Sequence, residues 1–339
     1  MNSKAIVITE PLQARLLDSP QQPPAANHLQ IKTLYSLVSP GTELAIYQGL
    51  ESWAPLPFNL GYAGVGRITA LGAGVTGYEI GETVLAYTPH RELSSVDLTS
   101  DYNVTVKLPA SGNLPELLFI RLAAVAITAL RVSPPELGDI VAVYGMGAIG
   151  NLAAQLCQLA GARVIGIDLA EHRLEQARAC GITETINPAK GDVLEQLLAL
   201  TGGVKANIIV EATGVPAVAA QAPRLGGPRS ELVLLGSPRG EYQCDLTKFL
   251  NYSHLWDHGC VTVKGALEWR YPTRPERGSK HSLTRNCNIL KDLIQSGKLK
   301  VRPLLTHLVN PAECQDVYQG LMYRKEEYTT VIFDWTKIQ

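Results

Sequence analysis

The chain has 339 residues, of which 46% are apolar, and it carries 30 basic against 31 acidic side chains for a formal net charge of −1. This length favours about two globular domains, and the balanced charge argues against nucleic acid or an anionic membrane as a partner. No apolar stretch approaches the ~20 residues of a membrane helix. The amino terminus lacks the shape of a signal peptide, so we expect a cytoplasmic protein.

Short alternating apolar runs, broken by Pro, Gly and Asn, fill the first third of the chain. They predict strands near residues 4–8, 29–35, 64–72, 83–87 and 104–109, at a spacing typical of a barrel. From Leu114 to Arg131 the apolar spacing becomes helical. We therefore predict a β-rich unit followed by a helix.

Strands and helices alternate through the middle of the chain. Strands are predicted at 140–144, 163–168, 184–187, 207–211, 231–236 and 261–265, and helices near 149–160, 171–180, 191–200 and 215–224. Such alternation is typical of an α/β domain, here with a doubly wound parallel sheet of about six strands.

The last seventy residues begin with a charged, proline-containing loop. A helix near 284–296, a strand near 304–308, a helix near 311–322 and a strand near 329–335 follow it. This tail has too little apolar material for a domain of its own, so we expect it to complete the β-rich unit. The predicted domains are a catalytic domain of residues 1–120 and 267–339 and a nucleotide-binding domain of residues 121–266.

The strand at 140–144 runs directly into Gly145-Met-Gly-Ala-Ile-Gly150 and then into a helix. In such a motif Gly145 allows the tight turn, Gly147 lets the backbone approach a pyrophosphate, and Gly150 lets the helix pack on the strand. Asp168 ends the next strand, where a carboxylate binds the ribose hydroxyls and repels a 2′-phosphate. The motif predicts a site for NAD rather than NADP.

With this layout the chain resembles the medium-chain dehydrogenase/reductase superfamily, which is alcohol dehydrogenase-like. The resemblance is carried by Gly61-Tyr-Ala-Gly-Val-Gly66, Gly145 to Asp168, Glu211-Ala-Thr-Gly214, Leu235-Gly-Ser-Pro238 and Arg302 to Leu308. It implies a GroES-like β-rich catalytic domain, a Rossmann domain and a homodimer. The cofactor contacts that we expect are Thr128, Gly145, Met146, Gly147, Ala148, Ile149, Gly150, Asp168, Arg173, Ala212, Thr213, Gly236 and Ser237.

The zinc ligands of that superfamily are not matched here. Its Gly-His-Glu motif stands as Gly61-Tyr62-Ala63, the segment Ser39–Glu43 holds no Cys, and the six cysteines form no CxxC pair. None of these replacements supplies the thiolate or imidazole that zinc prefers. We predict a zinc-free member without a metal site, most similar to the branch that includes bacteriochlorophyllide dehydrogenase.

Without a metal, a side chain must handle the proton that accompanies hydride transfer. Tyr62 stands where the resemblance places a metal ligand, and its phenol can donate or accept; the alternative is that it only fills the vacated space. In zinc relatives the residue matching Thr42 relays a proton. The alternative for this position is an N-cap, with Ser39 or Thr42 starting a short helix from Glu43 to Gln48.

Three further side chains are candidates for the same chemistry. Glu43 follows Thr42 directly. His90 follows a strand and titrates near neutrality, or else is an exposed loop histidine without a role. Lys264 ends the last strand of the nucleotide sheet, or else is a solvated strand end.

Tyr47, Trp53 and Trp269 are candidate substrate contacts, or else core and rim residues. Aromatic side chains beside charged ones suit a ring metabolite. We predict a zinc-independent, NAD-dependent oxidoreductase that transfers hydride between nicotinamide and a secondary alcohol or ketone of a sugar, cyclitol or other small ring metabolite. The alternatives are an NAD(P)H-dependent enoyl or quinone reductase and a catalytically inactive NAD(H)-binding protein.

Overall fold

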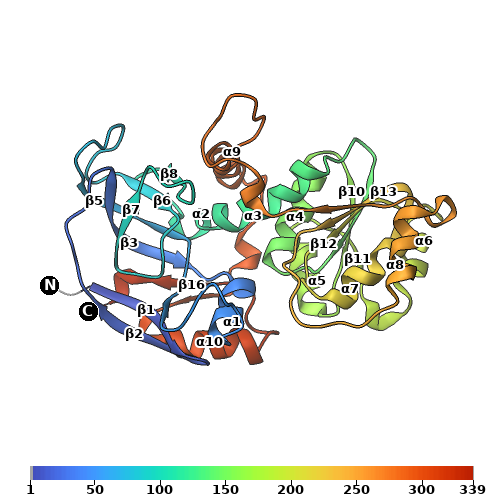
Figure 1. Cartoon of the computed structure of the whole chain (residues 1–339), viewed down its shortest axis with the longest axis horizontal. Helices are drawn as coiled ribbons and strands as arrows, with labels where there is room; N and C mark the ends of the chain where they lie inside the picture. Colours follow the sequence, from blue (N-terminus) through green and yellow to red (C-terminus); the bar gives the residue numbers. More distant parts are fainter. Residues whose placement is uncertain (1–2, 339) are drawn as a thin grey trace. The chain divides into compact units, whose positions relative to one another are not determined.

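The computed structural model describes residues 3–338 and divides the chain into two compact units (Figure 1). Unit 1 consists of Met1–Arg121, Tyr271–Ser296 and Leu304–Gln339, and unit 2 of Leu122–Arg270 and Gly297–Pro303. The last of these segments differs from the predicted division. It belongs to unit 2 because the Gln155 side chain donates to the Lys300 carbonyl at 2.9 Å and accepts from the Lys300 N–H at 2.8 Å.

Unit 1 is a β-rich unit with two sheets. One has the strand order β2-β1-β4, and the other has the order β15-β16-β3-β5-β6-β8, with β7 also paired to β3. The strands are β1 Ser3–Glu10, β2 Gln13–Ser19, β3 His28–Leu37, β4 Phe58–Asn59, β5 Gly64–Leu71, β6 Thr83–Ala86, β7 Leu93–Asp97, β8 Thr105–Lys107, β15 His307–Val309 and β16 Val331–Asp334.

Three of these strands, β2, β4 and β7, were not predicted. The β7 sequence Leu-Ser-Ser-Val-Asp shows why, since it offers only two apolar residues to a pattern search. The strand expected near 304–308 begins later, at His307, because Pro303 has no N–H for a ladder and Arg302–Leu304 forms a 3-10 turn instead.

The helices of unit 1 lie against these sheets. They are α1 Pro40–Tyr47, α2 Leu114–Leu117, α9 Leu283–Gln295 and α10 Cys314–Tyr323, and α3 Phe119–Val132 begins in unit 1 and continues in unit 2. One apolar core includes Ile6, Ile8, Tyr318 and Phe333, which come from β1, α10 and β16. The end of the chain therefore packs against its beginning, and β16 pairs antiparallel with β3.

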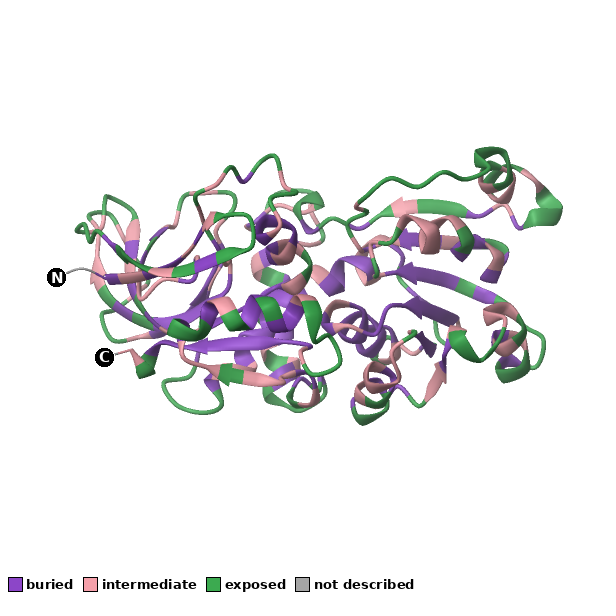
Figure 2. Ribbon diagram, turned by 90° about the horizontal axis from the view of Figure 1, so that it is seen from below, coloured by how far each residue is buried: buried purple, intermediate pink, exposed green. Residues whose placement is uncertain are grey.

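Unit 2 contains a six-stranded sheet in the order β11-β10-β9-β12-β13-β14, and every neighbouring pair is parallel. The predicted doubly wound α/β fold is confirmed. The strands are β9 Ile140–Tyr144, β10 Arg163–Ile167, β11 Glu184–Ile186, β12 Ala206–Glu211, β13 Gly226–Leu234 and β14 Thr262–Gly265. Three of the inner strands, β9, β10 and β12, are buried almost throughout (Figure 2), as their continuous apolar runs require.

The helices of unit 2 follow the strands in alternation. They are α4 Ala148–Leu159, α5 Glu171–Ala179, α6 Val193–Thr201, α7 Pro216–Gln221 and α8 Leu246–His254. Helix α8 was not predicted, although Asp245 is its N-cap and accepts from the Lys248 N–H at 3.3 Å. Across residues 3–338 no helix has the length and apolarity needed to cross a membrane.

Candidate functional site

The turn between β9 and α4 has the geometry that its glycines predict. Gly145 has φ +89°, a left-handed conformation that favours glycine, and a Cβ on Gly150 would lie 1.8 Å from the Gly145 carbonyl oxygen. Gly147 is the N-cap of α4 and has no side-chain cap, and a Cβ placed on it would meet nothing within 4 Å. The turn is therefore closed beneath Gly150 and open at Gly147, as a site for an anion at a helix N-terminus requires.

The loops that follow β12 and β13 lie beside this turn. The Glu211 carboxylate accepts the Thr213 N–H at 2.7 Å and the Gly214 N–H at 3.2 Å, which fixes the loop after β12. A Cβ on Gly236 would lie 2.3 Å from the Gly214 nitrogen, and one on Gly145 would lie 2.9 Å from Thr213 Cγ2. The predicted contacts Ala212, Thr213, Gly236 and Ser237 thus gather beside the glycine turn, at the carboxyl edge of the sheet.

Glu211 was not predicted to have a role in this site. It is 1% exposed, and its carboxylate is satisfied by the backbone of the loop that it precedes. A glutamate at the end of a buried strand, directly before Ala-Thr-Gly, is the signal that could have found it, because a buried carboxylate needs local donors.

Asp168 connects the glycine turn to the loop after β10. Its Oδ2 accepts the Met146 N–H at 2.7 Å, and its Oδ1 accepts the Ala170 N–H at 2.9 Å. Arg173 Nη1 lies 3.7 Å from Asp168 Oδ2. A carboxylate can accept about four hydrogen bonds. Asp168 can therefore accept further hydrogen bonds, for example from hydroxyl groups. The predicted residues Ala148 and Ile149 form the first turn of α4 directly beyond Gly147.

Two predicted residues of unit 2 have local partners instead. Thr128 is fully buried within α3, and its hydroxyl donates to the Ala124 carbonyl at 3.3 Å. Its predicted cofactor contact stays a prediction, since the side chain is enclosed within the fold and its hydroxyl is already paired. Lys264 Nζ lies 2.6 Å from Glu231 Oε1 and donates to the Val132 carbonyl at 3.0 Å. Lys264 is therefore an ion-paired strand residue rather than a solvated strand end.

In unit 1, Tyr62 lies at the centre of a small polar cluster. Its hydroxyl donates to Ser39 Oγ, and the guanidinium of Arg121 lies 4.4 Å from the centroid of its ring. Burial raises the pKa of Tyr62, and the charge of Glu43 adds to the rise. The Arg121 charge and the side-chain hydrogen bonds with Ser39 and Thr42 oppose it. The phenol is therefore protonated at neutral pH, the form in which it has a proton to donate.

Helix α1 begins earlier than predicted, at Pro40, with Ser39 as its N-cap. The expectation of a helix from Glu43 is wrong because proline at the first helical position has the required φ and needs no N–H partner. Thr42 lies inside the helix and is not the N-cap, and the Ser39 side chain makes no capping bond. Instead Glu43 Oε1 accepts the Ser39 N–H at 2.8 Å, and Thr42 hydrogen-bonds Tyr62.

Glu43 and His90 form a buried pair beneath this cluster. They are 1% and 0% exposed, and His90 Nε2 lies 2.9 Å from Glu43 Oε2, which also accepts the Tyr318 hydroxyl at 2.6 Å. The alternative of an exposed loop histidine is wrong. A Cβ on Gly61 would lie 2.6 Å from the His90 nitrogen, so the glycine before Tyr62 lets the two segments meet.

The other ring nitrogen of His90 continues the network. His90 Nδ1 lies 2.8 Å from Ser36 Oγ, which accepts the indole N–H of Trp335 at 2.8 Å. Because the indole can only donate, the Ser36 hydroxyl is able to donate to Nδ1, and Nε2–H then donates to Glu43. Both ring nitrogens of His90 therefore have hydrogen-bond partners. Tyr318, Ser36 and Trp335 were not singled out in the sequence, since they come from separate elements.

The network predicts a large stability effect for Glu43→Ala. The substitution leaves the Ser39 N–H, the His90 imidazole and the Tyr318 hydroxyl without their acceptor in a dry core. We expect a loss of about 3–5 kcal/mol in the free energy of unfolding, measured by urea denaturation. Glu79→Ala, at an exposed position, is the control. A loss for Glu43→Ala no greater than that of the control would contradict the network.

The aromatic substrate candidates lie in different environments. Tyr47 is 1% exposed, stacks on Tyr318 with a centroid distance of 5.3 Å, and donates to the Leu12 carbonyl at 2.8 Å. The structure places it in the core, which is the alternative given for it above, and its predicted substrate contact stays a prediction. Trp53 is exposed and donates to Glu51 Oε2 at 2.7 Å. Trp269 is exposed in the short 3-10 turn Glu268–Arg270. Both remain candidates.

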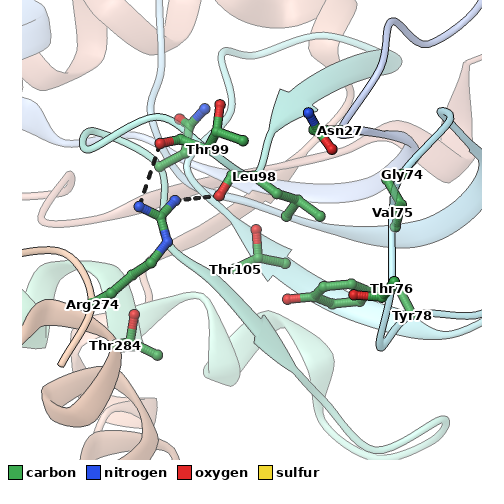
Figure 3. A pocket seen from close by; sticks show the side chains of 11 residues that line it. Asn27, Gly74, Val75, Thr76, Tyr78, Leu98, Thr99, Thr105, Arg274 and Thr284 are labelled. Atoms are coloured by element: carbon green, nitrogen blue, oxygen red, sulfur yellow. Dashed lines mark hydrogen bonds between the residues drawn. The ribbon is translucent and has the colours of Figure 1, made fainter.

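A polar hollow of about 360 Å³ opens elsewhere in unit 1 (Figure 3). Arg274 lies at its rim and donates to the Leu98 and Ser100 carbonyls, the second at 3.0 Å, so it holds the loop between β7 and β8. Its lining residues are Asn27, Gly74, Val75, Thr76, Tyr78, Leu98, Thr99, Asn103, Thr105, Arg274 and Thr284. None of the predicted site residues lines this hollow.

The strand order of unit 2 and the glycine turn after its first strand define a dinucleotide-binding domain of the Rossmann type. Comparison with known proteins agrees with this class. Residues 148–269 match the family described as zinc-binding dehydrogenase. The D-guloside 3-dehydrogenase of Shigella flexneri is 30% identical over 235 residues, which cover 62% of this chain and 67% of that protein.

Two further comparisons, one of sequence and one of structure, also find dehydrogenases. The sorbitol dehydrogenase of Halalkalibacterium halodurans is 29% identical over 230 residues, which are 59% of this chain and 66% of that protein. The crystal structure of galactitol-1-phosphate dehydrogenase from Escherichia coli superposes with a TM-score of 0.83 at 20% identity, covering 98% of this chain and 99% of that one. The chain belongs to the zinc-binding dehydrogenase family of medium-chain, alcohol dehydrogenase-like oxidoreductases.

Proposed function

We propose that this protein is an NAD-dependent dehydrogenase that oxidises a secondary alcohol of a sugar or polyol, or reduces the matching ketone. The observation that carries the proposal is the open glycine turn at Gly147 with the Asp168 carboxylate held beside it. The relatives named for a guloside, for sorbitol and for galactitol 1-phosphate support this substrate class. A homodimer, a cytoplasmic location and the bacteriochlorophyllide dehydrogenase branch remain predictions.

The residues of the glycine turn fit the cofactor. The N-terminus of α4 and the open face at Gly147 would hold the pyrophosphate, and Asp168 would accept the hydroxyls of the adenosine ribose. The loops at Ala212 to Gly214 and at Gly236 would lie along the rest of the molecule. When bound, NAD supplies the hydride acceptor of the reaction at nicotinamide C4.

Tyr62 is the proton-handling residue in this proposal. In the reducing direction its phenol donates a proton to the developing alkoxide, and in the oxidising direction its deprotonated form accepts the hydroxyl proton. Ser39 and Thr42 hydrogen-bond the phenol and orient it. Glu43 and His90 lie behind them and satisfy each other, so we assign them to positioning rather than to contact with substrate.

The residues around Tyr62 do not fit a catalytic zinc ion. Within residues 3–338 no group of three or more His, Cys, Asp or Glu side chains is arranged to hold a metal. Both oxygens of Glu43 and both ring nitrogens of His90 already have hydrogen-bond partners. Tyr62 occupies the position of the family's histidine. We therefore propose that this member works without zinc.

Turnover and metal content of one purified sample test the proposal together. With NAD⁺ and a panel of polyols, glycosides and sugar phosphates, we expect NADH to form with at least one of them, and elemental analysis should find no stoichiometric zinc. One zinc per chain would overturn the zinc-free mechanism. Reduction of enones without oxidation of any alcohol would favour a C=C reductase, and absence of all hydride transfer would favour an inactive NAD(H)-binding protein.

Cofactor preference should depend on Asp168. We expect Asp168→Ala to weaken NAD⁺ binding about tenfold or more and to improve binding of NADP⁺, because Arg173 is then released from its 3.7 Å pair to attract a 2′-phosphate. Titration of both cofactors measures the two constants. In Asp168→Ala/Arg173→Met the gain for NADP⁺ should disappear. Unchanged binding of NAD⁺ by Asp168→Ala would count against the ribose contact.

A further inference from the structure

The polar hollow of Figure 3 has no part in the proposed reaction. All of its lining residues belong to unit 1, and its volume of about 360 Å³ falls within the ~300–1,000 Å³ of pockets that bind small molecules. Such pockets are mostly apolar, but among the described residues that line this one only Val75 and Leu98 have apolar side chains. Hydroxyl groups come from five others, namely Thr76, Tyr78, Thr99, Thr105 and Thr284. The lining therefore favours a polar occupant.

The charges around the hollow are balanced. Arg274 is the only charged residue among the described residues that line it, and its Nη1 lies 3.4 Å from Asp101 Oδ1. Its Nη2 already holds the carbonyl groups of the loop between β7 and β8. Lys107 lies 5.3 Å from the centroid of the Tyr78 ring, and its Nζ lies 2.6 Å from Glu82 Oε1. Because each cation has a carboxylate partner, a neutral occupant fits better than an anion.

The polar groups of the lining include both donors and acceptors. Figure 3 shows the phenol of Tyr78 pointing into the hollow. Thr105 Oγ1 is buried and has no hydrogen-bond partner within residues 3–338. The Thr284 hydroxyl donates to the Thr273 carbonyl at 2.7 Å, and Asn103 Nδ2 donates to a backbone carbonyl at 3.0 Å, so each keeps an oxygen that can accept. A hydroxyl group both donates and accepts, so this set of groups matches a molecule that carries several hydroxyls.

We propose that the hollow is a second binding site, separate from Tyr62, for a small neutral molecule with several hydroxyl groups, such as a sugar or polyol. The molecule lies between the turn at Gly74–Tyr78, the loop from β7 to β8 and the start of α9. Each of its hydrogen bonds replaces one to water, so we expect a dissociation constant of about 1–10 mM. Binding here needs neither NAD nor hydride transfer, and the inference therefore goes beyond the proposed function.

The test uses the full-length protein with ¹³C-labelled threonine methyl groups, and sorbitol and myo-inositol as probes. The methyl resonances are followed by NMR as each polyol is added up to about 100 mM, well above the expected constant. We expect no shift at Thr185 of unit 2 and saturable shifts in the hollow, at Thr76, Thr99, Thr105 and Thr284. Absence of a saturable shift with either polyol would overturn the proposal, and so would shifts produced by sodium sulfate but by neither polyol.

A single hydroxyl distinguishes specific binding from a general effect of added polyol. Tyr78→Phe removes the phenol hydroxyl and keeps the ring over which Lys107 lies. We expect this variant to bind sorbitol about threefold or more weakly, because one hydrogen bond to the molecule is lost. Tyr323→Phe, at an exposed tyrosine of the same unit, is the matched control and should bind sorbitol as the parent does. Equal weakening in both variants, or in neither, would contradict the site.

The same spectra also report on the reaction site, because Thr42 hydrogen-bonds Tyr62. A shift of the Thr42 methyl without shifts in the hollow would place the polyol at the reaction site alone and overturn this inference. Shifts in the hollow of a protein that oxidises no alcohol would support the second site and count against the proposed function. The two proposals can therefore fail independently.

Discussion

Tyr62→Phe should lower turnover about 100-fold in both directions, because the variant keeps the ring and loses only the group that transfers the proton. Cofactor binding should be unchanged, since Tyr62 belongs to unit 1 and the glycine turn to unit 2. Steady-state kinetics and a cofactor titration measure the two quantities. Turnover at the parent rate would reduce Tyr62 to a packing residue that fills the position of the missing histidine.

The pH dependence of the two reaction rates tests the same hypothesis. Because burial raises the pKa of Tyr62, the phenol keeps its proton at neutral pH. Reduction, which needs the protonated phenol, should hold its rate through neutral pH and fall only at alkaline pH. Oxidation, which needs the deprotonated form as a base, should rise over the same alkaline range. Tyr62→Phe should remove both dependences, and a profile that survives the substitution would point to another titrating group.

Gly150→Ala should have the largest effect on the nucleotide-binding unit. A Cβ at this position would lie 1.8 Å from the Gly145 carbonyl oxygen and 3.1 Å from Ala212 Cβ, so backbone must move. Alanine in place of glycine gains about 1 kcal/mol of helix propensity, which is smaller than the ~3 kcal/mol or more expected from overpacking against backbone. We expect a lower thermal midpoint and loss of measurable NAD(H) binding.

Gly147→Ala is the matched variant, since it makes the same chemical change three positions earlier in the same turn. Gly147 has φ −63°, which alanine adopts without strain, and its Cβ would meet open space. Stability should therefore stay within about 1 kcal/mol of the parent, while NAD(H) affinity falls about tenfold or more because the methyl group enters the space that we assign to the pyrophosphate. Unchanged affinity would place the pyrophosphate elsewhere.

Local pattern was sufficient for the glycine turn and for the strands and helix around it. The strand at 140–144 has the bounds that were predicted. Strands β10 and β11 end one residue earlier than predicted, and α4 begins and ends one residue earlier. Gly145, Gly150 and Asp168 act through neighbours a few residues or one strand away. Such contacts can be predicted from the spacing of apolar residues along the chain and from the geometry of a single turn.

The cluster in unit 1 depends on contacts between distant segments. His90 reads in the sequence as a polar residue in a loop, yet Glu43, Ser36 and Phe333 enclose it from three elements. From the sequence, Tyr47 is a candidate substrate contact. In the structure it packs on Tyr318, which lies more than 250 positions later in the chain. Burial is a property of the assembled core, and no local pattern reports it.

The sequence by itself determined the class of the protein. A glycine turn, an acidic strand end and the alternation of strands and helices are local features, and each has a known physical role in dinucleotide binding. The sequence also has Tyr62 and Ala63 where the resemblance places the His and Glu of the family's motif, from which we predict a zinc-free member. Only the tertiary structure decided which charges face Tyr62. Arg121 lies 59 positions from Tyr62 in the chain and 4.4 Å from its ring in the fold, and the strength of an electrostatic interaction depends on the spatial distance and the surrounding medium, not on separation in the sequence.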